Sequence, residues 1–348
     1  MAVPTPATTK VAAVVTFYMT SALIMVFVNK AVLNNAPELP LTFLMIQLLI
    51  AVILLHASAA VTSRIEIPKL DMEVAKKLIP VVSVNIIGLV FNTLCLRGVE
   101  ASFFQIARGL VLPLTIAVSS VHTRTRPSRL VLGAASVVTI GFFLGITPSK
   151  SLPLSATPSL LSLFYGVLSS LFIAFHAVLI KSSLPHCNNS TIQLAWWTNV
   201  GSAILLLPPL AFQGELYLLR EKMLDVSWDS SVFLWGSLVT GVVGFLLCIA
   251  GLLSIKVTSP ITHMFSSAAR TVLQTLVGVC YFKDVLTANR ATSILVILGG
   301  TMYYTWVKSQ EPHPAPPRRP VDIEASGSDG HSKVEHNETP EKVGQAKA

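Results

Sequence analysis

Ten apolar runs, each about 18–24 residues long, follow one another between residues 11 and 307 of this chain. A helix of that length spans a hydrocarbon core of about 30 Å, whereas barrel strands would be short and alternating. Only 12% of the residues are charged, against roughly 25% in soluble domains. We therefore expect an all-α polytopic membrane protein. The predicted spans are Val11–Val32, Leu41–Ala60, Leu78–Val99, Ala101–His122, Leu130–Thr147, Ser159–Lys181, Ile192–Phe212, Val232–Ile255, Pro260–Phe282 and Ala288–Val307.

Charge and loop composition predict how the chain is divided and oriented. Ten spans place both termini on one side, and the loops there hold most of the lysines and arginines, so both termini are expected in the cytosol. The spans divide five and five, and the second half must then be inverted, as in many secondary transporters. The predicted parts are a cytosolic N-terminus 1–10, a first five-helix repeat 11–147, a lumenal connector 148–158, a second repeat 159–308 and a disordered cytosolic tail 309–348.

The ends and one loop of the chain carry further information. The first run has no small-residue cleavage site at a suitable place, so it is expected to remain as a span rather than be removed as a signal peptide. The last four residues, Gln345 to Ala348, lack the lysine pair that serves retrieval to the endoplasmic reticulum, which favours a later compartment. Tyr217–Leu224 mixes apolar and charged residues and is either an interfacial helix or a solvated loop.

Arg108 and Arg270 are lone cations inside two of the runs, with Ala107 before the first and Ala269 before the second. A buried arginine costs at least about 2.5–3.5 kcal/mol on insertion scales, so it usually faces a water-filled cavity or a partner anion. A guanidinium presents a planar fork of donors that suits phosphate oxygens. Two of them at matching places in two halves predict a central anion site. For Arg108, a third of the way into its run, snorkelling to the interface is the alternative.

Polar groups in the first and seventh runs are candidates for the same site. Lys30 lies beside Asn29 on the cation-poor side, where a cavity role and an interfacial anchor are about equally expected. Trp197, Thr198 and Asn199 combine an aromatic face with an amide, which suits a nucleobase through stacking and hydrogen bonds. A hydrogen bond to another helix is the competing explanation for Asn199.

The ninth run adds a stretch of small residues just before its arginine. Ser266 and Ser267 would let a ligand approach the backbone closely, but small residues also let helices pack closely, which is the commoner use. His263 lies in the same run and, like Asn92 and His176 elsewhere, is by itself more typical of a packing hydrogen bond than of a ligand contact.

Several kinds of chemistry are excluded by what the runs lack. None of the 17 carboxylates lies inside a run, although Glu100 borders one, whereas proton- or sodium-coupled carriers normally keep an intramembrane carboxylate. There is no Gly-rich phosphate loop and no nucleophile–base pair, and the four cysteines have neither zinc-ligand nor disulfide spacing. No basic and aromatic patch suggests nucleic acid. We therefore expect no enzymatic activity, no metal and no cofactor, and a cationic cavity without acids fits anion exchange.

With these residues in view, the chain resembles the nucleotide-sugar transporters of the drug/metabolite transporter superfamily, and most of all the GDP-fucose transporters of the Golgi. The resemblance runs over nearly all of residues 11–310. The segments that carry it are Met25 to Lys30, Phe91 to Leu96, Thr258 to His263, Gln274-Thr275 and Tyr304 to Val307.

The resemblance implies a fold of ten helices in two inverted halves, in the Golgi membrane rather than that of the endoplasmic reticulum. It implies that GDP-fucose or another GDP-sugar is exchanged for GMP by alternating access. Relatives that carry GDP-sugars have a Phe-Tyr-Asn-Asn motif in the seventh span, of which only Asn199 is kept here, and a small-residue motif ending in Lys in the ninth, where Arg270 stands. The candidate substrate-binding residues are Asn29, Lys30, Arg108, Trp197, Thr198, Asn199, His263, Ser266, Ser267 and Arg270.

Other functions stay open at this point. A carrier of triose or pentose phosphates would use a pair of basic residues for a single phosphate, and a UDP-sugar carrier would share the same architecture. A membrane scaffold would not need cations in the bilayer, and a dry centre around Arg270 would favour it. The expected partners are a nucleotide sugar, a nucleoside monophosphate and the lipid bilayer, with no nucleic acid; a homodimer is an open alternative.

Overall fold

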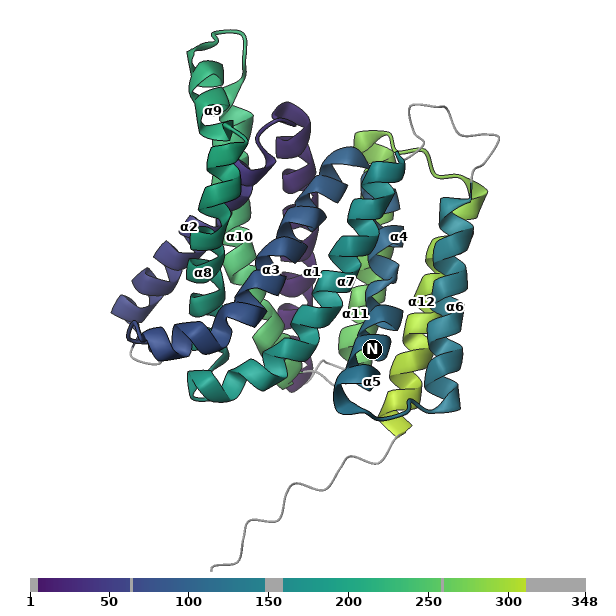
Figure 1. Ribbon diagram of the computed structural model, residues 1–348. Helices are drawn as coiled ribbons and strands as arrows, with labels where there is room; N and C mark the ends of the chain where they lie inside the picture. The colour runs from purple at the N-terminus through teal and green to yellow at the C-terminus, as the bar shows by residue number, and fades with distance from the viewer. Residues whose placement is uncertain (1–5, 63–64, 148–158, 258–259, 311–348) are drawn as a thin grey trace, which may run out of the picture. The chain divides into compact units, whose positions relative to one another are not determined.

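The computed structural model describes the backbone of residues 6–62, 65–147, 159–257 and 260–310, with side chains except those of residues 6–12, 14–15, 102 and 248–269. Contacts divide the chain into Met1–Gln310 and Glu311–Ala348, and the second unit lies outside the described residues. Every regular element in the described ranges is helical (Figure 1). The helices are α1 (Pro6–Asn35), α2 (Pro40–Val61), α3 (Met72–Gly98), α4 (Ala101–Gly109), α5 (Val111–Thr123), α6 (Arg129–Ile146), α7 (Leu160–Ser183), the 3₁₀ turn η2 (Leu184–Cys187), α8 (Thr191–Phe212), α9 (Glu215–Leu224), α10 (Ser230–Val257), α11 (Pro260–Phe282) and α12 (Ala288–Gln310).

The predicted membrane spans correspond to helices of this structure. Within the described residues, eight segments are long and apolar enough to cross a membrane, and they coincide with the first eight predicted runs. The ninth and tenth runs form α11 and α12, each of 23 residues. The expectation of an all-α polytopic membrane protein is therefore confirmed for the described part of the chain.

One predicted span is not a continuous helix. The run Ala101–His122 divides into α4 and α5, with a break at Leu110. Pro113 explains the position, because its ring nitrogen has no hydrogen to donate to the carbonyl of Gly109 and its ring collides with that carbonyl. The break lies two residues after Arg108, in the middle of the bundle.

The segment Tyr217–Leu224, which the sequence left undecided between an interfacial helix and a solvated loop, is helical and is attached to the bundle. It belongs to α9, and the first residue of that helix, Glu215, is 1% exposed. The carboxylate of Glu215 accepts hydrogen bonds from the backbone N–H groups of Leu41 (3.1 Å) and Thr42 (2.7 Å) in the first turn of α2. Those amides have no partner inside their own helix, and a negative charge there is also favoured by the helix dipole.

A second set of contacts attaches α9 to the bundle. Lys222 pairs with Glu38 in the α1–α2 connection and lies over the ring of Trp228 at 5.4 Å. Although partial burial acts to raise it, the pKa of Glu38 is lowered overall, because Lys222 donates a hydrogen bond to its carboxylate and adds a positive charge. Both contacts lie at the end of the bundle that carries α9 (Figure 1).

We expect replacement of Glu215 by alanine to lower stability by about 1–2 kcal/mol, the range for a lost helix cap. In thermal unfolding of the detergent-solubilised protein, this corresponds to a midpoint lower by roughly 3–6 °C. Glu221→Ala is the matched control, because Glu221 is an exposed carboxylate on the same helix. A midpoint for Glu215→Ala equal to that of the control would contradict the assigned capping role.

Helix packing follows a regular scheme. The most extensive pairs are α6 with α12, α3 with α7 and α1 with α10, followed by α2 with α10, α5 with α7, α2 with α8 and α3 with α8. Small residues allow the closest of these approaches: a Cβ on Gly141 would meet Ile297 at 2.9 Å, and one on Gly145 would meet Ser293 at 2.4 Å. Interfaces of this kind are typical of helices that associate within a membrane.

The largest buried cluster lies at the end of the bundle that carries α9. Its members include Val32 and Leu33 of α1, Leu96 of α3, Phe103 of α4, Phe142 of α6, Phe233 of α10 and Ile294 of α12. Side chains fill this end, so the described cavities lie in the middle of the bundle and toward the opposite end.

Candidate anion and nucleotide site

A cavity of about 420 Å³ brings the two intramembrane arginines together. Arg108 enters from the end of α4 and Arg270 from the middle of α11, with Ile297 to Tyr304 of α12 along one wall. Arg108 is exposed although it lies in the middle of the bundle, because two cavities meet at its side chain. The structure therefore brings the two cations to one cavity, as the sequence predicted.

Aromatic rings support both guanidinium groups. Arg270 donates from Nη1 to the Tyr18 hydroxyl of α1 at 3.4 Å, and its Cζ lies 5.6 Å from the centre of the same ring. The Cζ of Arg108 lies 5.7 Å from the ring of Phe104, one turn earlier on α4. A cation over an aromatic face gains about 0.5–2 kcal/mol, which helps to hold charge within the bundle.

Gln105 adds a further donor to the arginine cavity. Its side chain is 8% exposed, and its Nε2 is buried without a hydrogen-bond partner in the described part of the chain. Leaving a buried donor unpaired costs about 1–3 kcal/mol. The hydroxyls of Thr115 and Thr301 in the same cavity donate to carbonyls of their own helices, at 2.7 Å each, and keep only acceptor capacity. An unpaired amide beside two cations suits an anion with several oxygens.

A second cavity, of about 230 Å³, shares Arg108 with the first. Asn85 and Asn92 of α3 and His176 of α7 line it. Asn85 donates to the Ser202 hydroxyl at 3.1 Å, and the Nε2 of His176 is buried with no partner among the described residues. Asn92 and His176, interpreted from the sequence as packing groups, both line a cavity that reaches an arginine. Asn92 also accepts a hydrogen bond from the Ser169 hydroxyl of α7 at 3.4 Å, as a packing group would.

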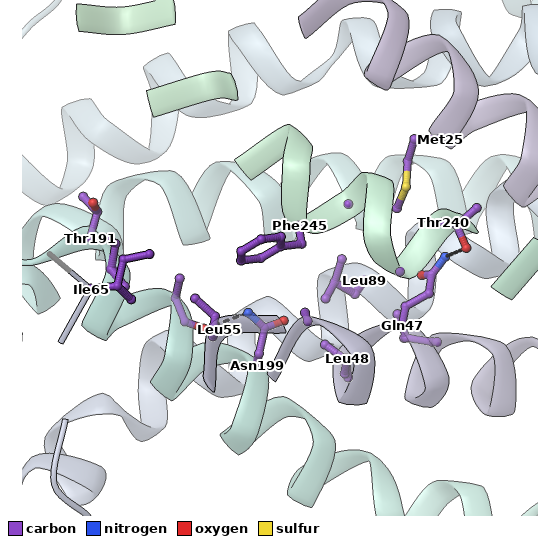
Figure 2. A pocket seen from close by; sticks show the side chains of 16 residues that line it. Met25, Gln47, Leu48, Leu55, Ile65, Leu89, Thr191, Asn199, Thr240 and Phe245 are labelled. Atoms are coloured by element: carbon purple, nitrogen blue, oxygen red, sulfur yellow. Dashed lines mark hydrogen bonds between the residues drawn. The ribbon is translucent and has the colours of Figure 1, made fainter. Parts of the chain in front are cut away.

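A third cavity, of about 520 Å³, shares Leu89 with the second and is largely apolar. It lies between α1, α2, α3, α8 and α10, and Figure 2 shows its lining. Its polar side chains include the amides of Gln47 and Asn199, and the ring of Phe245 lies among its aliphatic walls. The three cavities therefore form a series that is linked by shared residues, with amides and an aromatic ring at one end and two arginines at the other.

The aromatic residue predicted to meet a base does not line the described cavities. Trp197 is 6% exposed and belongs to a buried cluster with Leu78 and Val82 of α3. Thr198 is 9% exposed, and its hydroxyl donates to the carbonyl of Ala195 at 3.0 Å. Of the three predicted residues of α8, Asn199 alone faces a described cavity, and its Nδ2 donates to the carbonyl of Ala195 at 2.7 Å.

Lys30 is engaged with the backbone of another helix. Its ammonium donates to the carbonyl oxygens of Leu96 (2.9 Å), Arg97 (3.3 Å) and Val99 (2.6 Å), and the residue is 8% exposed. These carbonyls end α3 and have no intrahelical donor, so one side chain satisfies three of them. Lys30 lines none of the three cavities described above.

Asn29 does not line the apolar cavity, but it binds a residue that does. Its Oδ1 accepts a hydrogen bond from Gln47 Nε2 at 2.8 Å. The remaining predicted site residues, His263, Ser266 and Ser267, lie on α11, but their side chains are outside the described ones.

The most buried cation of the described chain was not predicted. Arg290 is 1% exposed and forms an ion pair with Glu100 at the start of α4. It also donates to the carbonyl of Val285 at 2.9 Å and lies 5.5 Å from the centre of the Phe103 ring. Glu100 in turn accepts from the backbone N–H of Val285 at 3.3 Å. Arg290 is the third residue of the tenth predicted run, close to its end.

Charge in the three cavities has one sign. Their lining residues, all within the described part of the chain, include two arginines and no aspartate or glutamate. No group of three potential metal ligands occurs among the described residues. Cations and neutral donors around an acid-free space can bind a phosphate-bearing anion, and the adjoining apolar space can hold a ring attached to it.

The comparisons with known proteins agree with this geometry. The chain is 31% identical to "GDP-fucose transporter 1" of Mus musculus, over 87% of this chain and 84% of that protein. It is 30% identical to "GDP-fucose transporter 1" of Nematostella vectensis, over 93% and 97% of the two chains. It is 28% identical to "GDP-fucose transporter, Golgi" of Drosophila melanogaster, over 87% and 91%. Residues 9–305 match the Triose-phosphate Transporter family. The chain, a polytopic membrane protein with a central cationic cavity, belongs to the Triose-phosphate Transporter family of membrane transporters.

Proposed function

We propose that this chain is a Golgi antiporter that exchanges GDP-fucose, or another GDP-sugar, for GMP. The observation that carries the proposal is the single cavity that holds Arg108 and Arg270 and adjoins, through shared residues, an apolar space with two amides. Relatives named as GDP-fucose transporters align with most of the chain, and one of them is named for the Golgi. The arginines would hold the phosphates, and the apolar cavity would hold the base.

A small sugar phosphate is a weaker fit to the same space. A triose or pentose phosphate would engage the two arginines but would leave the apolar cavity of about 520 Å³ without an apolar ligand group. Ligand sites are typically lined by apolar side chains with a few polar groups that fix orientation, and a nucleobase meets both conditions here. We therefore favour a nucleotide sugar.

Antiport fits the absence of carboxylates from the described cavity walls. Coupling to protons or sodium ions normally uses an intramembrane carboxylate, and the three cavities contain none among the residues that the structure describes. Exchange of two anions needs only cations and neutral donors. A nucleoside monophosphate leaving in the other direction would then drive the cycle.

Helix packing supports two inverted five-helix halves, residues 11–147 and 159–308. Exchanging each helix with its counterpart five spans later turns the pair α3–α7 into α10–α1, and the pair α2–α10 into α8–α3; all four pairs occur. The pairs α6–α12 and α2–α8 map onto themselves. In Figure 1, α1 joins α2 at the end that carries α9, and α7 joins α8 at the other end, as inversion requires. Rocking one half against the other would alternate access to the cavities.

The distribution of charge supports cytosolic termini for this proposal. The α2–α3 connection, the start of α3, the α5–α6 connection and the end of α12 lie at the end of the bundle away from α9 (Figure 1). These segments carry Lys69, Lys76, Arg124, Arg126 and Lys308. By the positive-inside rule that end faces the cytosol. In this orientation residues 148–158 are the lumenal connector and residues 309–348 the cytosolic tail.

Counterflow into proteoliposomes tests the function. Vesicles are loaded with GMP, UMP, inorganic phosphate or buffer, and uptake of labelled GDP-fucose is measured. We expect GMP inside to stimulate uptake several-fold over buffer, with UMP and phosphate close to buffer. Stimulation by phosphate but not by GMP would favour the sugar-phosphate carrier, stimulation by UMP would favour a UDP-sugar carrier, and uptake equal to that of protein-free vesicles would contradict transport.

A further inference from the structure

Gln47 lies in the wall of the apolar cavity and is fixed from two sides. Its Nε2 donates to Asn29 Oδ1 of α1 at 2.8 Å and to Thr240 Oγ1 of α10 at 2.8 Å. An amide nitrogen has two hydrogens, so both donors are used. Figure 2 shows Gln47 and Thr240 side by side at one end of the cavity, joined by the second of these bonds.

One of the two partners, Thr240, is held in the role of an acceptor. The Thr240 hydroxyl donates its own hydrogen within α10, to the carbonyls of Gly236 (2.8 Å) and Ser237 (3.2 Å), so it meets Gln47 as an acceptor. Turning the Gln47 amide over would place its oxygen against the Thr240 oxygen and break that bond. The network therefore assigns the nitrogen and oxygen of Gln47, which geometry alone often leaves ambiguous.

The consequence is a fixed acceptor at the cavity wall. Gln47 Oε1 has no hydrogen-bond partner among the described residues, while the residue lines the cavity. A ligand group opposite this oxygen must donate. A ligand that offers a lone pair there would leave two acceptors facing each other in a low-dielectric space, where an unmet polar group is costly.

We propose that Gln47 is a specificity-determining residue that selects the donor edge of guanine. Guanine offers two neighbouring donors, the N1–H and the 2-amino group, whereas adenine offers one donor, the 6-amino group, beside an acceptor nitrogen at position 1. Phe245 and the aliphatic walls suit the faces of a purine ring, and Asn199 has a carbonyl oxygen that accepts no hydrogen bond from any described residue. The inference rests on the proposed function, because it assigns the base to this cavity.

Nucleotide binding to purified protein tests the inference. Dissociation constants for GMP, IMP and AMP are measured by titrated thermal shift on the wild type and on Gln47→Met, which keeps the length of the side chain without its polar atoms. In the wild type we expect the order GMP, then IMP, then AMP, since IMP keeps N1–H but lacks the 2-amino group. In Gln47→Met we expect GMP to bind about tenfold more weakly and AMP to change less than twofold.

Two further variants separate selectivity from stability. Thr240→Val removes one of the two acceptors that fix the amide, so the ratio of AMP to GMP dissociation constants should fall even where the protein stays folded. Gln213→Met is the matched control, because Gln213 is an exposed glutamine at the end of α8, and it should keep wild-type ratios.

The outcomes distinguish this inference from the function on which it rests. If the wild type prefers GMP and both Gln47→Met and Thr240→Val keep the wild-type ratio of AMP to GMP dissociation constants, the role of Gln47 is wrong while the proposed function stands. If the wild type binds none of the guanine nucleotides, GDP-fucose included, the proposed function itself fails. If Gln47→Met does not fold, the ratio measured for Thr240→Val decides.

Discussion

Replacing Arg270 with alanine is expected to reduce GDP-fucose exchange by roughly 100-fold, with little change in the amount of folded protein. Hydrogen bonds to a charged group contribute about 1.5–3 kcal/mol, and about 1.4 kcal/mol corresponds to a factor of ten. Arg270 shares its cavity with Arg108 and the unpaired amide of Gln105, so removing one guanidinium halves the positive charge available to phosphates. Initial rates of counterflow in proteoliposomes at low substrate concentration measure the effect.

Three variants make that result specific. Arg270→Lys keeps the charge but loses the planar fork, so we expect a smaller loss than for alanine. Tyr18→Phe removes only the hydroxyl that Arg270 contacts at 3.4 Å and should stay within about threefold of the wild type. Arg126→Ala, at an exposed loop position, is the matched control. Normal exchange by a folded Arg270→Ala protein would contradict the assignment of this cavity to phosphate.

Replacing Glu100 with glutamine is expected to cause the largest loss of stability. Arg290, which is 1% exposed, would lose the carboxylate of Glu100, and breaking a buried ion pair from one side costs about 3–5 kcal/mol. Thermal unfolding in detergent should show a midpoint lower by about 10 °C. Glutamine keeps the shape of the side chain, so the effect reports on charge rather than on packing.

A double variant tests the physical reason. In Glu100→Gln/Arg290→Met both members of the ion pair are neutral, so we expect part of the lost stability to return relative to Glu100→Gln alone. Glu73→Gln, an exposed carboxylate in the first turn of α3, provides the control. A midpoint for Glu100→Gln within about 2 °C of the control would show that the pair does not hold the start of α4 to the start of α12.

Much of the fold could be predicted because membrane insertion depends on local composition. Each apolar run is read from its own residues, and the first eight runs match segments that can cross a membrane. The break at Leu110 was missed although Pro113 signals it, because hydropathy does not register a missing backbone donor. The helix at Glu215–Leu224 could not be decided from pattern alone, since its docking depends on amides of α2 that are far away in sequence.

The candidate site was predictable where it contains residues that are costly to bury unless they face a cavity or a partner. Arg108 and Arg270 stand out against apolar surroundings, and the structure places both in one cavity. Gln47 carried the same signal, an amide inside a predicted span, but a neutral group is less conspicuous than a charge. Trp197 was predicted to face a ligand from its chemistry, whereas its direction depends on packing against α3, which places it in a core.

The sequence by itself determined the class of protein, the positions of its spans, the two intramembrane arginines and the absence of carboxylates inside the spans. These are properties of short segments, because the free energy of transferring a helix into lipid is summed over its own residues. Only the tertiary structure decided which polar groups meet. It united Arg108 with Arg270, assigned Lys30 to the end of α3, and fixed the amide of Gln47 between Asn29 and Thr240, because those contacts join helices far apart in the chain.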